Sequence, residues 1–175
     1  MLPLLCTGWR QPLFMNAIVL GLGNAIRTDD GVGIHAIRKL VGEHHLPPDV
    51  HTIEGGTLGL ELLPRIKGVS HLLALDAVDA GAAPGTLIRY AGGELANLPT
   101  DKSLHLLGFT DLVGTLSLLD ATPREVILLG IQPKSTDWGT DLSAEVEARL
   151  NGLVEAAWEQ VSNWLQTERR GPKTH

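Results

Sequence analysis

A short apolar run, a glycine pair and two adjacent acids constrain this chain most. Residues 18–20 include β-branched side chains and show no polar alternation, which is typical of a strand buried on both faces of a parallel sheet. Gly21 and Gly23 follow and predict a tight turn. Asp29 and Asp30 then stand directly before a helical pattern. Two acids at the carboxyl end of a first strand indicate a candidate site.

Strand and helix patterns alternate along the rest of the chain. Between residues 32 and 41 the apolar side chains recur at helical spacing, and residues 50–53 and 71–75 form short apolar runs. Strand, helix, strand, helix, strand is the order of a parallel α/β sheet, whose crossovers are right-handed. The expected helices cover residues 32–43, 58–66, 103–116 and 143–165, and the last expected strand covers residues 125–129.

One strand is expected to run against the others. Residues 86–90 have a strand pattern, but they follow the run at 71–75 too soon for a helical crossover. We therefore predict an antiparallel strand at the edge of the sheet, and the polar Arg89 agrees with an edge position. The residue pattern thus predicts an α/β fold with a mostly parallel sheet.

Composition limits the partners and the chemistry. The chain has 175 residues, of which 43% are hydrophobic, enough for one core. Its net charge of −6 favours neither nucleic acid nor anionic lipid as a partner. No apolar run reaches the ~20 residues needed to cross a bilayer. The single cysteine, Cys6, provides neither an internal disulfide nor a multi-cysteine metal site. We expect a cytoplasmic monomer without membrane insertion.

The expected domain covers residues 15–165. Residues 1–14 lack the cleavage pattern of a signal peptide, and Met15 stands directly before the first strand. We therefore interpret residues 1–14 as a leader or a misassigned start. Residues 166–175 are polar and are expected to form a flexible tail.

Three consecutive strands end on acids: Asp29 and Asp30 after the first, Glu54 after the second and Asp76 after the third. In open α/β sheets, ligand sites form outside the carboxyl ends of the strands. Each acid also has an ordinary explanation when taken alone. Asp30 can cap a helix, Asp76 can end a strand in a turn, and Glu54 can support the turn at Gly55. Their shared position is what indicates a site.

His105 completes a candidate metal site. It falls in the first turn of the helix that Ser103 is expected to cap, where the positive helix end disfavours an imidazolium and favours the neutral, metal-binding ring. If the preceding loop folds over the sheet edge, His105 meets Asp30 and Asp76. One nitrogen and two carboxylate ligands would suit a borderline divalent ion and leave open positions. The ordinary alternative is a histidine that is simply hydrogen-bonded to a carboxylate. His44 and His45, at a helix end, are interpreted as complementing the helix dipole, with a metal role as the alternative.

Other chemistries have little support. The glycine turn lacks the third glycine of the dinucleotide fingerprint, since Ile26 stands in its place. The sequence contains no G-x-S-x-G elbow, no H-E-x-x-H helix and no P-loop. An aspartic dyad of Asp29 and Asp30 is disfavoured because sequence neighbours seldom face each other across one proton.

The order of the motifs resembles one protein family. The motifs are Gly21-Leu22-Gly23-Asn24, Asp29-Asp30-Gly31-Val32-Gly33, Glu54-Gly55-Gly56-Thr57, Leu75-Asp76-Ala77-Val78-Asp79, Ser103-Leu104-His105 and Gly130-Ile131-Gln132-Pro133. In this order they resemble the signature of the hydrogenase maturation proteases, the endopeptidases that trim the large subunit of nickel-iron hydrogenases. The resemblance runs from Met15 to Leu165. Each motif is weak alone, but the ordered set is specific.

The resemblance implies a fold and a site. The fold is a three-layer α/β sandwich, a twisted and mostly parallel five-stranded sheet with one antiparallel edge strand and helices on both faces. The implied metal-binding and catalytic residues match Asp30, Asp76 and His105. Glu54 departs by one methylene from the aspartate that is commoner at its position in the family, so a hydrogen bond from that position need not be kept.

The implied reaction is a single cut that removes the C-terminal extension of the nickel-iron hydrogenase large-subunit precursor after nickel insertion. Asp30, Asp76 and His105 would recognise the nickel that the substrate carries, and the isolated enzyme can be metal-free. Two other classes stay open: a Rossmann-like domain that binds a nucleotide or another small molecule, and a nickel chaperone without catalytic activity.

Overall fold

Five strands form one sheet in the order β2-β1-β3-β5-β4 in this computed structural model, which describes residues 15–170. The strands are β1 (Ala17–Leu22), β2 (Val50–Gly56), β3 (His71–Ala77), β4 (Leu87–Ala91) and β5 (Glu125–Ile131). β1 pairs in parallel with β2 and β3, and β3 pairs in parallel with β5. Residues 1–14, the expected leader or misassigned start, lie outside the described residues.

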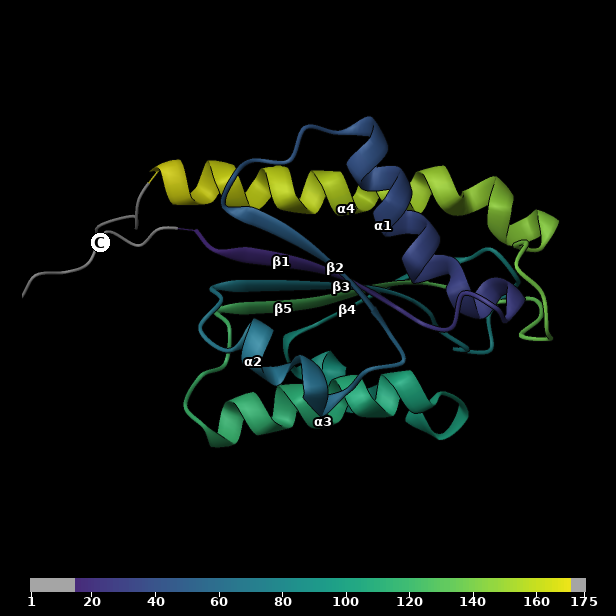
Figure 1. The fold of residues 1–175 in the computed structure, drawn as a ribbon, viewed down its shortest axis with the longest axis horizontal. Coiled ribbons are helices and arrows are strands. Elements are labelled where there is room, and N and C mark those ends of the chain that lie inside the picture. The colour runs from purple at the N-terminus through teal and green to yellow at the C-terminus, as the bar shows by residue number, and fades with distance from the viewer. Residues whose placement is uncertain (1–14, 171–175) are drawn as a thin grey trace, which may run out of the picture.

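Helices cover both faces of the sheet, α1 and α4 on one and α2 and α3 on the other (Figure 1). They are α1 (Val32–Glu43), α2 (Leu63–Ile66), α3 (Leu104–Leu118) and α4 (Ala144–Arg170), with short 3-10 helices η1 (Thr28–Gly31), η2 (Leu60–Leu62), η3 (Gly92–Asn97) and η4 (Thr100–Lys102). The predicted three-layer α/β sandwich is confirmed.

The edge strand β4 is antiparallel, as predicted. β4 pairs with β5 and not with β3, the strand that precedes it in the chain. β5 lies between β3 and β4 in the sheet, so the short connection from β3 to β4 passes the end of β5. A connection of this length leaves no room for a crossover helix, and the strand therefore returns in the opposite direction.

Each face of the sheet has its own apolar core, and β1 contributes to both. Ala17 and Val19 pack with α1 and α4, whereas Ile18 and Leu20 pack with α3. Every residue of β1 is buried. This explains why the strand shows an uninterrupted apolar run instead of alternation.

The second helix is shorter than expected. Instead of one helix over residues 58–66, the chain forms η2 and then the single turn of α2. Pro64 stands in the first turn of α2, where its missing N–H is tolerated. The interior of a longer helix would disfavour the same proline, because it has no N–H to donate to the carbonyl four residues earlier.

Three other details differ from the prediction. Gly21 belongs to β1, and only Gly23, with φ +102°, makes the turn after the strand. The segment before the expected helix at 103–116 is not a plain loop, because it contains η3 and η4. The last helix continues past Leu165 to Arg170, and Arg124 donates to Glu168 within this extension. Residues 171–175 lie outside the described residues.

No helix in residues 15–170 combines the length and the apolar character that a membrane crossing requires.

Candidate functional site

The structure brings Asp30, Asp76 and His105 together at the carboxyl edge of the sheet. Asp30 lies in η1, directly after the turn that follows β1, and Asp76 lies in β3 beside it. His105 comes from the first turn of α3, which the Ser103 hydroxyl caps by accepting from the Leu106 N–H. The connection from β1 runs over one face of the sheet and the connection from β2 to β3 over the other, so this edge is a topological switch point.

The imidazole of His105 bridges the two carboxylates. Its Nε2 donates to Asp30 Oδ1 at 2.8 Å, and its Nδ1 donates to Asp76 Oδ2 at 2.9 Å. Asp76 and His105 are buried, and Asp30 is partly buried. The three side chains form one continuous chain of charged hydrogen bonds, Asp76 to His105 to Asp30.

The remaining carboxylate oxygens are also occupied. Asp30 Oδ2 accepts from the Asn24 N–H at 3.0 Å, and Asp76 Oδ1 accepts from the Ala77 N–H at 2.8 Å. Asp30 therefore does not cap α1, whose N-cap residue Gly31 has no side chain. Both oxygens of each acid are used, which holds the carboxylates in fixed orientations.

The expected neutral state of His105 is wrong. Burial lowers the pKa of His105, but the hydrogen bonds and negative charges of Asp30 and Asp76 outweigh it and raise the pKa to about 10. Burial raises the pKa of the fully buried Asp76 to about 6 against the influence of His105. Burial acts in the same sense on Asp30, yet its bond to His105 holds the pKa of this more exposed carboxyl below the usual value. The helix end is a weaker influence than two facing carboxylates.

The three groups do not point at one common centre in this state. Asp30 and Asp76 bind opposite nitrogens of one ring, so a metal between Asp30 and His105 Nε2 requires that bond to open. The ring must also lose a proton, because a metal ligand is a neutral imidazole nitrogen. Asp76 can keep its bond to Nδ1 and orient the ring, as carboxylates behind metal-bound histidines do.

A polar cleft of about 330 Å³ adjoins Asp30. Its lining comes from η1, the end of β3, the start of α3 and the segment after β5, namely Asp30, Ala77, Asp79, Ser103 and residues 132–136. Gln132 is buried and accepts from the N–H groups of Ala80 and Ala82, while its Nε2 donates to Asp79 Oδ1. Gln132 and Asp79 both belong to motifs of the family resemblance, but no contact between the two side chains was expected.

Asp29 is a structural anchor of this cleft. Its side chain is buried and accepts from the N–H groups of Lys134, Ser135 and Ser143 and from the Ser143 hydroxyl, at 2.6–3.1 Å. Asp29 therefore supports the segment after β5 and takes no part in the hydrogen-bonded chain of Asp76, His105 and Asp30. Asp29 and Asp30 bind different groups and do not form an aspartic dyad.

Two sequence interpretations change with the tertiary contacts. Glu54 does not support the turn after β2; both its oxygens accept from Arg38 of α1, at 2.8 and 3.0 Å. His44 stacks on Trp158 of α4, and its Nε2 lies 3.4 Å from Glu155. Glu43, His44 and Glu155 form a group in which the possible metal-ligand atoms all lie within 4.8 Å of one another. Both glutamates are exposed to solvent.

The glycine turn is closed to a phosphate. The Gly23 N–H donates to the Gly56 carbonyl, and the Asn24 N–H donates to Asp30. The Ile26 N–H donates to the side chain of Asn24. A dinucleotide-binding turn offers such N–H groups to the pyrophosphate, and these three are already occupied.

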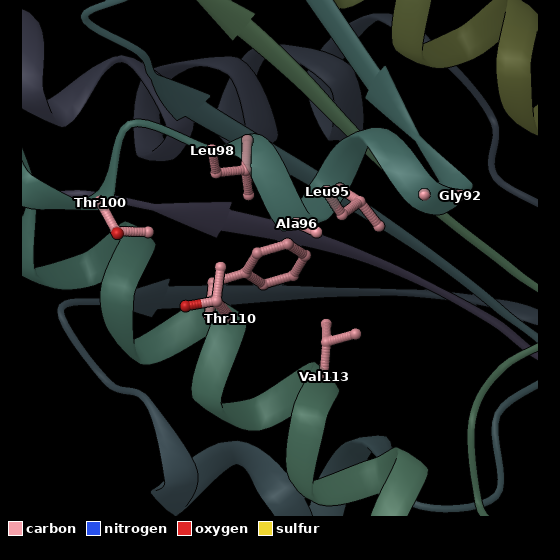
Figure 2. Close-up of a pocket in the computed structure, with 9 residues that line it drawn as sticks. Gly92, Leu95, Ala96, Leu98, Thr100, Thr110 and Val113 are labelled. Atoms are coloured by element: carbon pink, nitrogen blue, oxygen red, sulfur yellow. The ribbon is translucent and has the colours of Figure 1, made fainter.

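A second cavity, of about 350 Å³, lies between α3 and the two 3-10 helices that precede it (Figure 2). Its lining is largely apolar and includes Leu95, Leu98, Phe109 and Val113. Neither Asp30 nor His105 lines this cavity. It belongs to the packing of η3 and η4 on α3 and not to the charged site.

Comparison with known sequences gives a consistent result. A model of the hydrogenase maturation protease family matches residues 34–160. The hydrogenase expression/formation protein HupD of Rhodobacter capsulatus is 33% identical over 150 residues, which are 84% of this chain and 71% of that protein. The hydrogenase 2 maturation protease of Escherichia coli is 36% identical over 149 residues, which are 84% of this chain and 88% of that protein.

Solved structures agree. The hydrogenase maturating endopeptidase HybD from Escherichia coli superposes with a TM-score of 0.82 at 30% identity, covering 85% of this chain and 93% of that one. The [NiFe] hydrogenase maturation protease HybD from Thermococcus kodakarensis gives a TM-score of 0.69 at 28% identity, covering 84% of this chain and 99% of that one.

Proposed function

Because this chain belongs to the hydrogenase maturation protease family and is a peptidase of hydrogenase maturation, we propose that it cuts the nickel-loaded precursor of a nickel-iron hydrogenase large subunit. The cut removes the C-terminal extension of the precursor after nickel has been inserted. Asp30, Asp76 and His105 carry this proposal, because they form one hydrogen-bonded chain of which Asp30 lines the cleft.

The nickel is part of the substrate and serves as a checkpoint. Before a precursor binds, His105 lies between two carboxylates that satisfy both of its ring nitrogens. When a loaded precursor enters the cleft, His105 would release its Nε2 proton to solvent, and Asp30 and Nε2 would exchange their mutual bond for bonds to the substrate's nickel. Asp76 would join them or hold the ring. A precursor without nickel makes no such bonds and is not cleaved. The enzyme discriminates between the two forms of the precursor through this difference in affinity.

Hydrolysis needs a water that loses a proton. Two routes fit the site: a water activated by the substrate's nickel, or a water whose proton is accepted by a carboxylate at the cleft, for which Asp30 is the ionised candidate. Replacing nickel by zinc in the precursor separates them. The first route makes the rate depend on the acidity of the metal-bound water, whereas the second leaves the rate nearly unchanged once the metal is recognised.

The same proposal places the protein in the cytoplasm as a monomer. The lone cysteine, Cys6, agrees with a reducing compartment, and the charged site is built from one chain alone.

The decisive experiment incubates the protein with nickel-loaded and nickel-free precursor and follows the mass of the large subunit. We expect loss of the extension only from the loaded form. His105→Ala should abolish cleavage while the far-ultraviolet circular dichroism stays native. His45→Ala, at an exposed histidine, is the control and should cleave normally.

Retained cleavage by His105→Ala would remove this histidine from the site. An absence of cleavage by the wild-type protein, with nickel passed to another protein instead, would favour the chaperone.

A further inference from the structure

Large apolar side chains are exposed at the edge of the sheet that carries the charged site. Among the described residues, the exposed ones at this edge are Ile26, Leu58, Leu60, Leu104, Leu107 and Trp138. The other exposed large apolar residues in this part of the chain are Val41, Leu118 and Leu119, which lie at helix ends away from this edge. Single exposed apolar residues are ordinary, but their concentration beside a site is not.

Four leucines form one group, which we call the leucine patch. Leu104 and Leu107 belong to the first turns of α3, and Leu58 and Leu60 belong to the segment after β2. The two segments touch through their backbones, because a Cβ built on Gly59 would lie 3.0 Å from the Gly108 Cα. Leu104 directly precedes His105, and 85% of its surface is exposed.

A second group, the tryptophan patch, consists of Ile26, Arg27 and Trp138. The Arg27 guanidinium carbon lies 5.7 Å from the centre of the Trp138 ring, and 77% of that tryptophan is exposed. The backbone holds the group together, because the Gly139 N–H donates to the Ile26 carbonyl. Arginine and tryptophan are enriched among the residues that dominate binding energy at protein interfaces.

Each patch adjoins a residue that lines the polar cleft. Ser103 lines the cleft immediately before Leu104, and Thr136 lines it two residues before Trp138. Arg27 Nε donates to the Thr136 carbonyl, which ties the tryptophan patch to the cleft wall. Both patches are therefore next to the path of a protein chain that enters this cleft.

The size of the cleft makes such contacts necessary. A stable protein complex buries about 800 Å² on each partner. A cleft of about 330 Å³ beside three charged side chains accommodates only a short piece of chain and leaves most of that area to its surroundings.

We propose that the leucine and tryptophan patches dock an apolar surface of the folded large-subunit precursor next to its extension. This inference rests on the proposed function and assigns binding and nickel recognition to different groups of residues. The patches hold the precursor whether or not nickel is present, and the charged site then distinguishes the loaded form.

The test compares variants in the cleavage of nickel-loaded precursor. Leu104→Ser and Trp138→Ala should each raise KM about 10-fold and leave kcat within about 2-fold, since they remove contacts made equally before and during the reaction. Leu118→Ser is a closely matched control: Leu118 lies at the other end of α3 and is 87% exposed, so its KM should equal that of the wild type.

Titration with nickel-free precursor provides a second readout. The same two variants should weaken its binding by a similar factor, whereas Leu118→Ser should not. Unchanged KM and unchanged binding in both patch variants, with normal thermal unfolding, would overturn the docking surface while leaving the protease intact. Failure of the wild type to cleave loaded precursor would instead overturn the proposed function.

Discussion

At the scale of single residues, the adjacent acids Asp29 and Asp30 do different work. The side chain of Asp30 faces the cleft and His105, whereas that of Asp29 is turned inward and accepts four hydrogen bonds from the segment between β5 and α4. The difference arises because successive side chains of the tight η1 turn point in different directions. One residue contributes charge to the site, and its neighbour fixes the wall beside it.

Asp29→Asn tests this anchor. The amide NH2 replaces one of the two carboxylate oxygens and faces the N–H group of either Lys134 or Ser143, so at least one of these donors loses its acceptor. We expect the free energy of unfolding in urea to fall by about 3 kcal/mol. The exposed Asp141→Asn, close to the start of α4, is the control and should change it by less than about 0.5 kcal/mol. Equal stability of the two variants would contradict the anchoring role.

At the scale of elements, the site depends on how closely α1 approaches the sheet. Gly33 in the first turn of α1 lies against the backbone of β1 and β3, where an added Cβ would overlap the carbonyl oxygens of Leu22 and Leu75. Gly21 makes the reciprocal approach from β1, since its Cβ would overlap the Gly33 carbonyl. Because η1 leads directly into α1, this contact also sets the position of Asp30.

Gly33→Ala should therefore push α1 away from the sheet. The obstacle is backbone on two strands, which cannot turn aside as a side chain would, and we expect a loss of about 2–3 kcal/mol in the free energy of unfolding. Gly42→Ala is the matched control in the same helix: nothing lies within 4 Å of its Cβ, and alanine should stabilise the helix by about 0.5–1 kcal/mol. Chemical denaturation of both variants measures the contrast. A Gly33→Ala variant as stable as the wild type would show that α1 can shift without cost.

At the scale of the whole molecule, the strand order explains where the site lies. β1 and β3 are neighbours, and the chain goes from β1 to β2 on one side and from β3 to β4 on the other, so the strand order reverses at their carboxyl ends. The site is thus built into the fold, and its charges contribute to the stability of the fold.

This contribution should depend on pH. The pKa of His105 is raised from 6.5 to about 10 in the folded protein, so the stability that it adds is complete below pH 6.5 and is lost as the pH rises through 10. Urea denaturation between pH 7 and 10 should show the stability difference between the wild type and His105→Gln shrinking by at most about 1.4 kcal/mol per pH unit. The comparison cancels the titrating groups that do not contact His105, whereas Asp76 loses in the variant the partner that lowers its pKa. A constant difference would mean that His105 is neutral at pH 7.

The features of this protein that depend on residues close together in the sequence could be predicted from the sequence alone. The alternating patterns, the antiparallel strand at 87–91 and the cap at Ser103 follow from local backbone preferences, and the switch-point rule groups Asp30 with Asp76. The boundaries were less readable: the helix expected at 58–66 shrank around Pro64, and α4 ran on to Arg170.

Only the tertiary structure decided what each charged side chain binds. Asp29 and Ser143 are 114 residues apart, and Glu54 meets Arg38 across two elements. The charge of His105 was mispredicted because the helix end is a local influence, whereas the two carboxylates that outweigh it come from distant segments. Local patterns determine which elements form; partners and protonation states depend on distances and burial, which exist only once those elements have packed.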